Sequence, residues 1–240
     1  MKSSQKILGV SEKDITEVIK ESLGKASKQP EKQVIAEAYV VTTSKYDLAT
    51  EKLSEENKRA HQELMEGYAK SLNEISAALD SVDRDNVNPN NSSFRSLKID
   101  ESYNLNAAFL HGMFFENISD VRSTVAMDSL SYMRLERDFG SFDAWQRDFI
   151  ACALTARNGW VVTVYNFFLK RYMNVVVDLH SNGVPFSAVP VIVFDCWEHS
   201  YYRDYLKDRR SYVFAMMKEL KWTTIEDRIR RVERMVEASK

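Results

Sequence analysis

Apolar side chains recur at helical intervals over two stretches in the first half of the chain. Between residues 53 and 79 they are spaced by three or four residues, at Leu64, Met65, Tyr68, Leu72, Ile75 and Leu79. This spacing predicts one long helix with Ser54 as its N-cap. Residues 81–96 are crowded with Asn, Asp, Pro and Ser, which favour turns, so we expect a loop there. A second long helix is predicted from about Asn104 to Asn117.

The pattern changes in the second half of the chain. We expect helices over residues 120–137 and 141–156. Three short runs rich in Val, Ile and aromatic residues then follow, which predicts three strands at residues 160–165, 172–179 and 189–194. Helical spacing returns over residues 201–236. The order indicates an α+β fold, with a long antiparallel helical hairpin followed by helices around a small three-stranded antiparallel sheet.

We expect three parts along the chain. Residues 1–45 form an N-terminal extension rich in Lys, Glu and Ser, with a short amphipathic helix predicted around residues 15–23. Residues 46–120 would form the helical hairpin domain, and residues 121–240 the α/β C-terminal domain. No internal repeat interrupts this order.

Composition narrows the class of protein. The chain has 240 residues, of which 44% are hydrophobic and 28% are charged, and this balance is typical of a globular protein. The net charge of −2 argues against a nucleic-acid partner. Neither a membrane-spanning stretch nor a secretory signal is evident, so we expect an intracellular protein, in the cytoplasm or an organelle matrix. Cys152 and Cys196 lack metal-site spacing, and we expect both to be reduced.

The four histidines of the chain are the candidate chemical groups. His61 and His111 lie on the two predicted long helices, which an antiparallel arrangement would bring together. Asp195 ends a very apolar strand, where burial would be costly without a partner, and His199 follows four residues later. Three imidazoles and one carboxylate suit iron, manganese or zinc. A single histidine on an apolar helix is more often a hydrogen-bonded core residue, and an aspartate at a strand end is often a cap.

Residues 195–205 read DCWEHSYYRDY, and this segment resembles the DxWEHxYYxDY signature of iron/manganese superoxide dismutases. Shorter segments resemble the same family in the same order along the chain. They are YD at residue 46, HGMFFEN at 111, FGSFD at 139, GW at 159, RRSYV at 209 and LKW at 220. The resemblance covers about residues 46–236.

The resemblance implies a metal site and a reaction. The ligands would be His61, His111, Asp195 and His199, holding one iron or manganese ion per chain. His180 occupies a position where family members carry a residue that hydrogen-bonds the metal-bound solvent. The implied reaction converts superoxide to oxygen and hydrogen peroxide, so the substrate is a small anion. The choice between iron and manganese stays open.

The resemblance also implies roles around the metal. Tyr68, Trp160 and Trp197 match residues that surround the metal, with Tyr68 at the mouth of the site. Arg209 matches a basic residue of the access funnel; read without the family, it would form a surface salt bridge.

The resemblance further implies a homodimer. Glu198 matches a residue that reaches across a two-fold axis to the partner's metal-binding histidine, and Tyr202 lies beside it. Read without the family, Glu198 would cap the last helical region.

Several positions depart from the family pattern. Tyr68 follows His61 by seven residues where the family has eight, and a competing register would place Ala60 at the ligand position. Phe115 and Val162 replace aromatic residues near the metal, and the family's LPxLPY opening is absent. An alternative function is therefore a structural or assembly subunit that keeps the fold, with the N-terminal extension docked to a larger protein partner. A zinc hydrolase fits poorly, because no spare general base stands near the motif.

Overall fold

The computed structural model describes residues 38–118 and 123–239. The short helix predicted around residues 15–23 lies outside the described residues. The described residues belong to one compact unit. Its elements in chain order are α2 (Glu55–Ser81), α3 (Ser93–Asn117), α4 (Leu130–Phe139), α5 (Phe142–Thr155), β1 (Gly159–Asn166), β2 (Arg171–Asp178), β3 (Ala188–Asp195), α6 (Glu198–Tyr205), α7 (Arg209–Met216), the 3₁₀ helix η1 (Met217–Glu219) and α8 (Trp222–Ala238).

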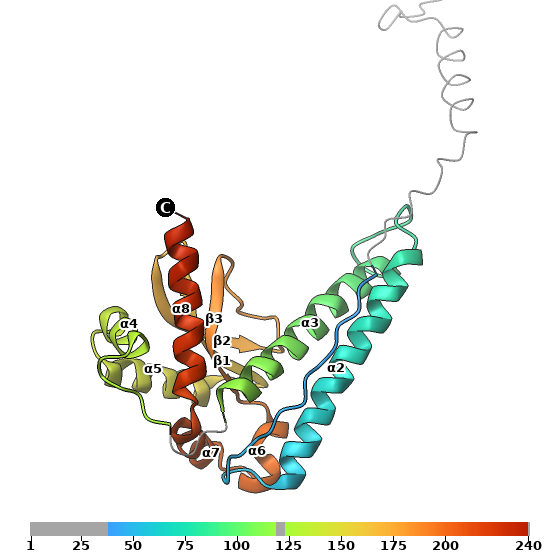
Figure 1. The fold of residues 1–240 in the computed structure, drawn as a ribbon. Coiled ribbons are helices and arrows are strands. Elements are labelled where there is room, and N and C mark those ends of the chain that lie inside the picture. The colour runs from blue at the N-terminus through green and yellow to red at the C-terminus, as the bar shows by residue number, and fades with distance from the viewer. Residues whose placement is uncertain (1–37, 119–122, 240) are drawn as a thin grey trace, which may run out of the picture. The chain divides into compact units, whose positions relative to one another are not determined.

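Helices α2 and α3 form the predicted antiparallel hairpin (Figure 1). Ser54 caps α2 as predicted, because its hydroxyl accepts a hydrogen bond from the backbone N–H of Asn57 at 3.2 Å. An extended segment, residues 38–54, which we call the strap, runs along the hairpin (Figure 1). The side chain of Asn73 holds the strap by exchanging two hydrogen bonds with the backbone of Val41, at 2.7 and 2.9 Å.

Two predicted helix starts were wrong. Helix α3 begins at Ser93, about three turns before Asn104, because the hydroxyl of Ser92 caps it by accepting from the N–H of Arg95 at 3.1 Å. The Ser residues that we assigned to the loop thus include the cap of the helix. Helix α4 begins at Leu130 and not near residue 120, with Ser129 as its cap. Among the described residues before it, 123–129 are not helical.

The sheet is antiparallel, in the order β2-β1-β3. The central strand β1 is buried along its whole length. Gly159 starts this strand where a Cβ atom would lie 2.2 Å from the carbonyl oxygen of Val177, so only glycine allows the close pairing with β2. The fold class that we expected, an α+β fold with a helical hairpin and a three-stranded antiparallel sheet, is confirmed.

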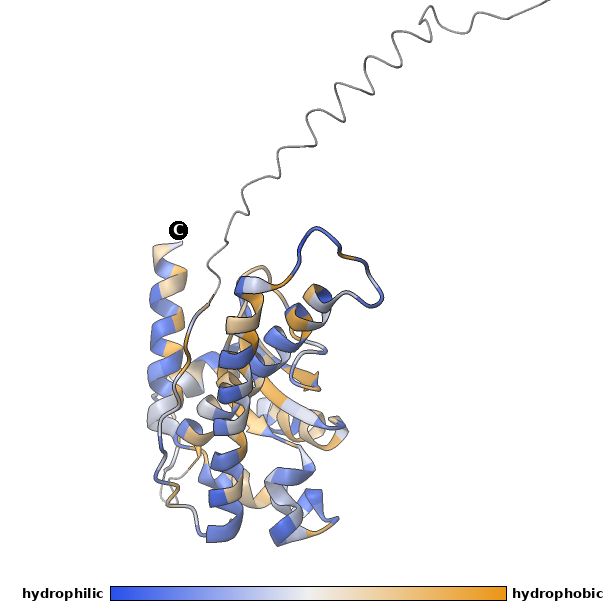
Figure 2. Cartoon of the chain, turned by 90° about the vertical axis from the view of Figure 1, so that its right-hand side faces the viewer, coloured by the Kyte–Doolittle hydropathy of each residue, from blue (hydrophilic) through white to orange (hydrophobic). Residues whose placement is uncertain are grey.

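Helix α8 packs against α4 and the strand β3. Its buried positions Ile225, Ile229 and Val232 recur every three or four residues, as an amphipathic helix requires. Figure 2 shows the hydrophobic colour gathered on the strands, whereas α8 is largely hydrophilic. Within the described part of the chain, every helix is too short or too polar to cross a membrane.

Candidate metal centre

Four side chains from four different elements meet at one point. His61 comes from α2, His111 from α3, Asp195 from the end of β3, and His199 from the first turn of α6. One ligand atom of each lies within 4.8 Å of those of the others. Asp195 and His111 are fully buried, His61 is nearly so, and His199 is partly exposed. The structure thus brings together the four residues that the sequence predicted as metal ligands.

The carboxylate of Asp195 lies at the centre of this cluster. Its Oδ2 atom is 3.0 Å from Nε2 of His61, 3.2 Å from Nε2 of His199 and 3.7 Å from Nε2 of His111. Its other oxygen, Oδ1, accepts a hydrogen bond from the backbone N–H of Trp197 at 2.8 Å, which fixes the carboxylate plane. One carboxylate oxygen therefore faces three imidazole nitrogens.

The protonation of His111 follows from its neighbours. Its Nδ1 atom lies 2.7 Å from the carbonyl oxygen of Ala107, and because a carbonyl can only accept, Nδ1 carries the hydrogen. In the neutral ring, Nε2 then presents a lone pair toward Asp195 and toward Nε2 of His199, which is 3.3 Å away. A lone pair directed at a carboxylate oxygen is repelled unless a cation stands between them.

Burial favours the protonation states that a metal needs. Burial lowers the pKa of His61, and it lowers the pKa of His111 well below the usual value, so both rings stay neutral. Burial alone would raise the pKa of Asp195, but the neighbouring His199 and His61 rings outweigh it and hold that pKa well below its ordinary value. Neutral imidazoles and one anionic carboxylate form a donor set that fits a divalent or trivalent transition metal.

His180 lies beside the cluster, outside the four donors. The indole N–H of Trp160 can only donate, so its 2.9 Å bond to Nδ1 of His180 leaves the ring hydrogen on Nε2. That Nε2 lies 3.3 Å from the hydroxyl of Tyr68. The ring stacks on Trp197 with the centroids 4.8 Å apart. Burial lowers the pKa of His180 to about 4, which keeps the ring neutral near pH 7.

Tyr68 is half-buried and lies beside the cluster. Its ring centroid is 5.4 Å from that of His111, and burial raises the pKa of its hydroxyl. Helix α2 is continuous from residue 55 to 81, so the seven-residue step from His61 to Tyr68 is two turns on one face. His61, and not Ala60, is the residue that reaches the cluster.

Sequence reasoning missed Tyr103 on α3. Its ring centroid is 4.8 Å from that of His180 and 6.3 Å from that of Tyr68. The signal that would have found it is its spacing, because it lies eight residues before His111 and therefore on nearly the same helix face. Tyr68, Tyr103 and His180 together form a small polar group beside the donors.

The two tryptophans form apolar walls. Trp160 is fully buried with its ring centroid 4.8 Å from that of His111, and Trp197 lies 5.6 Å from His199. The guanidinium of Arg209 does not contact the four donors; it donates to the carbonyl oxygens of Ala156 and Arg157 just after α5. It forms none of the ion pairs found among residues 38–118 and 123–239.

Glu198 and Tyr202 lie on α6 with exposed side chains. Glu198 is the first residue of that helix, but the N-cap position belongs to Trp197, which makes no side-chain capping bond. The expected capping role of Glu198 is therefore not seen. The exposure of both side chains leaves them free to contact another molecule.

Comparison with known proteins identifies the family. Residues 129–228 match the family described as iron/manganese superoxide dismutases, C-terminal domain. The chain is 30% identical over 177 residues to a superoxide dismutase [Fe] of Aquifex aeolicus, which covers 72% of this chain and 82% of that protein. It is 36% identical over 121 residues to superoxide dismutase [Mn] 2 of Haloferax volcanii, covering 50% of this chain. That match spans 60% of the length of the Haloferax protein.

The name of each of these relatives specifies iron or manganese. Three imidazoles and one carboxylate in this chain form a mononuclear site suited to either metal. Since the Aquifex aeolicus protein is matched over most of its length, this chain belongs to the iron/manganese superoxide dismutase family.

Proposed function

We propose that this protein is a superoxide dismutase that converts superoxide to oxygen and hydrogen peroxide. The observation that carries the proposal is the convergence of His61, His111, Asp195 and His199 within 4.8 Å. The relatives, which are named superoxide dismutases, support the same activity. A purely structural subunit has no evident need for four donors, three of them buried, that converge on one point.

The chain's own residues supply the setting for the reaction. A bound iron or manganese ion would supply redox chemistry, taking an electron from one superoxide and giving one to the next. The anionic Asp195 lowers the positive charge of the site and so helps to set its redox potential. Trp160 and Trp197 form apolar walls that limit water around the donors.

We infer that Tyr68 and His180 hold protons near the site. Their hydroxyl and imidazole groups lie 3.3 Å apart, and Trp160 fixes the orientation of the His180 ring. Both stay uncharged near pH 7, since burial raises the pKa of Tyr68 and lowers that of His180. The positive charge of Arg209, whose guanidinium is held by the carbonyl oxygens of Ala156 and Arg157, would attract an anionic substrate.

The test is metal content and activity on the purified full chain. Protein reconstituted separately with iron and with manganese should hold about one ion per chain, as one four-donor site requires. With at least one of the metals it should inhibit the reduction of cytochrome c by xanthine oxidase. Full occupancy without inhibition would reject the catalytic proposal and favour a structural role.

We also propose a homodimer formed through α6. The exposed Glu198 and Tyr202 would contact a second copy of the chain. Light scattering after gel filtration should give twice the chain mass, and the double change Glu198→Ala, Tyr202→Ala should reduce it to one chain mass. Lys207→Ala, at an exposed position just after α6, is the matched control. A monomeric unmodified protein would reject the dimer.

The division of the chain into residues 46–120 and 121–240 stays a prediction. We propose it because each segment contributes two of the four donors, His61 and His111 from the first and Asp195 and His199 from the second.

A further inference from the structure

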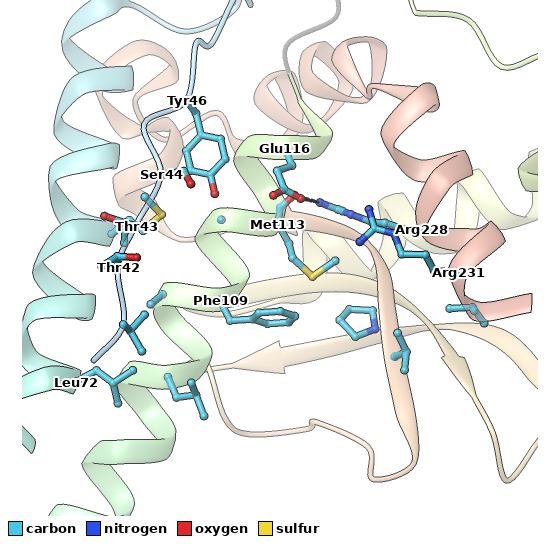
Figure 3. Close-up of a pocket in the computed structure, with 18 of the residues that line it drawn as sticks. Thr42, Thr43, Ser44, Tyr46, Leu72, Phe109, Met113, Glu116, Arg228 and Arg231 are labelled. Atoms are coloured by element: carbon cyan, nitrogen blue, oxygen red, sulfur yellow. Dashed lines mark hydrogen bonds and ion pairs between the residues drawn. The ribbon is translucent and has the colours of Figure 1, made fainter. Parts of the chain in front are cut away.

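A cavity of about 580 Å³ lies apart from the metal centre, between the strap, α3, β3 and α8 (Figure 3). Its volume falls within the range of about 300–1,000 Å³ that is typical of small-molecule sites. None of the four metal-ligating residues lines it. Because it shares no donor with the metal centre, its role is independent of the proposed dismutase activity.

The walls of the cavity are mostly apolar. Leu72 of α2 lies at one side, and Phe109 and Met113 of α3 form the long wall (Figure 3). Pro190 of β3 also lines the cavity. Several large apolar side chains remain open to solvent here: Leu105 is 46% exposed, Phe109 52% and Met235 51%. A gathering of exposed apolar side chains in a concave surface is typical of a site that a ligand covers.

The charged groups of the lining stand on the α8 side. They are Glu116, Arg228 and Arg231. Arg228 is buried, and its guanidinium already donates to Glu116 at 2.8 Å, to Asn117 at 3.0 Å and to two backbone carbonyl oxygens. Arg231 is exposed and makes no ion pair or side-chain hydrogen bond with the described residues. With one carboxylate and two guanidinium groups, this side of the cavity has a net positive charge.

Short polar side chains complete the opposite wall. The strap places Thr42, Thr43 and Ser44 along the cavity (Figure 3). These side chains are small, and the cavity extends from Leu72 past Phe109 to Arg231. It thus joins an apolar region to a guanidinium group that makes no ion pair with the described residues.

We propose that this cavity binds an anionic amphiphile with one unbranched alkyl chain, such as a fatty-acid carboxylate. The carboxylate would pair with Arg231, since a guanidinium matches the planar geometry of a carboxylate. The alkyl chain would lie along Phe109 and Met113 toward Leu72. The combination of apolar walls and a single free guanidinium favours this class over a neutral lipid, which would leave Arg231 unpaired, and over a polar metabolite, which would leave the apolar walls exposed.

The test is calorimetric titration of the full-length protein with decanoate below its micelle concentration. We expect one saturable site per chain, and affinity that rises about fourfold for each added methylene from octanoate to dodecanoate. Decan-1-ol, which has the same chain length without the charge, should bind about tenfold more weakly. No saturable binding, or equal affinity for the alcohol and the acid, would overturn the proposal.

Two variants with matched controls locate the ligand. Arg231→Gln should weaken decanoate binding about tenfold, whereas Arg234→Gln, an exposed position of the same helix outside the cavity, should leave it unchanged. Phe109→Asp should abolish binding, because it puts a negative charge in the apolar wall, whereas Ile99→Asp on the exposed surface of α3 should not. Equal losses in a variant and its control would overturn the assigned site.

Circular dichroism and metal content of every variant would separate loss of the ligand from loss of the fold. Since the half-exposed Phe109 and the exposed Arg231 are not core residues, both variants should keep the spectrum of the unmodified protein. Weakened decanoate binding in folded, metal-loaded Arg231→Gln protein supports the proposal whatever its dismutase activity.

Discussion

Two buried polar clusters join α3 to β3, and they differ in how completely the protein satisfies them. At one, Asn117 exchanges two hydrogen bonds with the backbone of Val193, at 2.8 and 2.9 Å, and Arg228 donates to the carbonyl of Val191. These bonds close the outer edge of β3. At the other, a single oxygen of Asp195 faces three imidazole nitrogens.

The difference separates a structural cluster from a functional one. In the Asn117–Arg228 cluster, donors meet acceptors, so the protein alone satisfies it. In the Asp195 cluster, acceptor faces acceptor, because the Nε2 lone pair of His111 points at a carboxylate oxygen. A cation among the donors removes this repulsion. Buried polar groups therefore indicate a ligand when their lone pairs converge.

The largest effect that this comparison predicts is the loss of the metal in Asp195→Asn. The amide keeps the shape of the side chain but removes the negative charge that the three imidazoles face. We expect less than about a tenth of one metal ion per chain and no measurable dismutase activity, with the far-ultraviolet circular dichroism spectrum unchanged. Metal analysis after reconstitution measures this. Full occupancy in the variant would show that the carboxylate is not a ligand.

Changing the Asn117–Arg228 cluster should lower the stability of the fold and leave the metal content unchanged. Arg228→Met removes a buried charge, and Asn117 and the carbonyl oxygens of Met113 and Val191 each lose the hydrogen bond that Arg228 donates. We expect the free energy of unfolding to fall by about 3 kcal/mol, measured by urea denaturation. The metal content of the folded protein should stay near one ion per chain. Loss of metal at full stability would contradict the division of roles between the two clusters.

A smaller effect is expected beside the metal centre. Tyr68→Phe removes the hydroxyl that lies 3.3 Å from Nε2 of His180 but keeps the ring against His111. We expect kcat to fall about tenfold with metal content unchanged, as is typical of residues just outside the ligands. Tyr103→Phe is the matched control, because it removes a hydroxyl from the neighbouring ring, whose centroid lies 6.3 Å from that of Tyr68, and the loss of activity should be smaller. Equal activity in Tyr68→Phe and unmodified protein would exclude a role for that hydroxyl.

The smallest effect concerns Glu226 on α8, which accepts hydrogen bonds from the backbone N–H groups of Leu130 and Ser131 at the start of α4. Burial by itself raises its pKa, but these bonds outweigh it and lower the pKa below the ordinary value. The folded carboxylate thus stabilises the protein above its unfolded pKa near 4.5, and this contribution is lost as the pH falls through the folded pKa. Glu226→Gln should cost about 1 kcal/mol at pH 7. The difference from unmodified protein should disappear at low pH; a constant difference would contradict the assignment.

Local sequence determined much of the fold. The α+β order, the three strands and the extent of α2 follow from the periodicity of apolar residues and from the cap at Ser54. The start of α3 did not, because Ser92 lies within a run of turn-forming residues and its capping bond depends on the chain already being helical. A residue type that suits both a turn and a helix cap leaves the boundary undecided.

The candidate donors could also be found in the sequence. The segment at residues 195–199 contains two of them, and the chain has only four histidines from which to select the others. The tertiary structure decided the rest. The structure shows that His61, and not Ala60, reaches the cluster, and that the contact with Ala107 directs the lone pair of His111. It also places Tyr103 beside His180 and forms a cavity between the strap and α8. Periodicity along a chain reports which side chains share a face of one element. Distances between faces of different elements arise only when those elements pack.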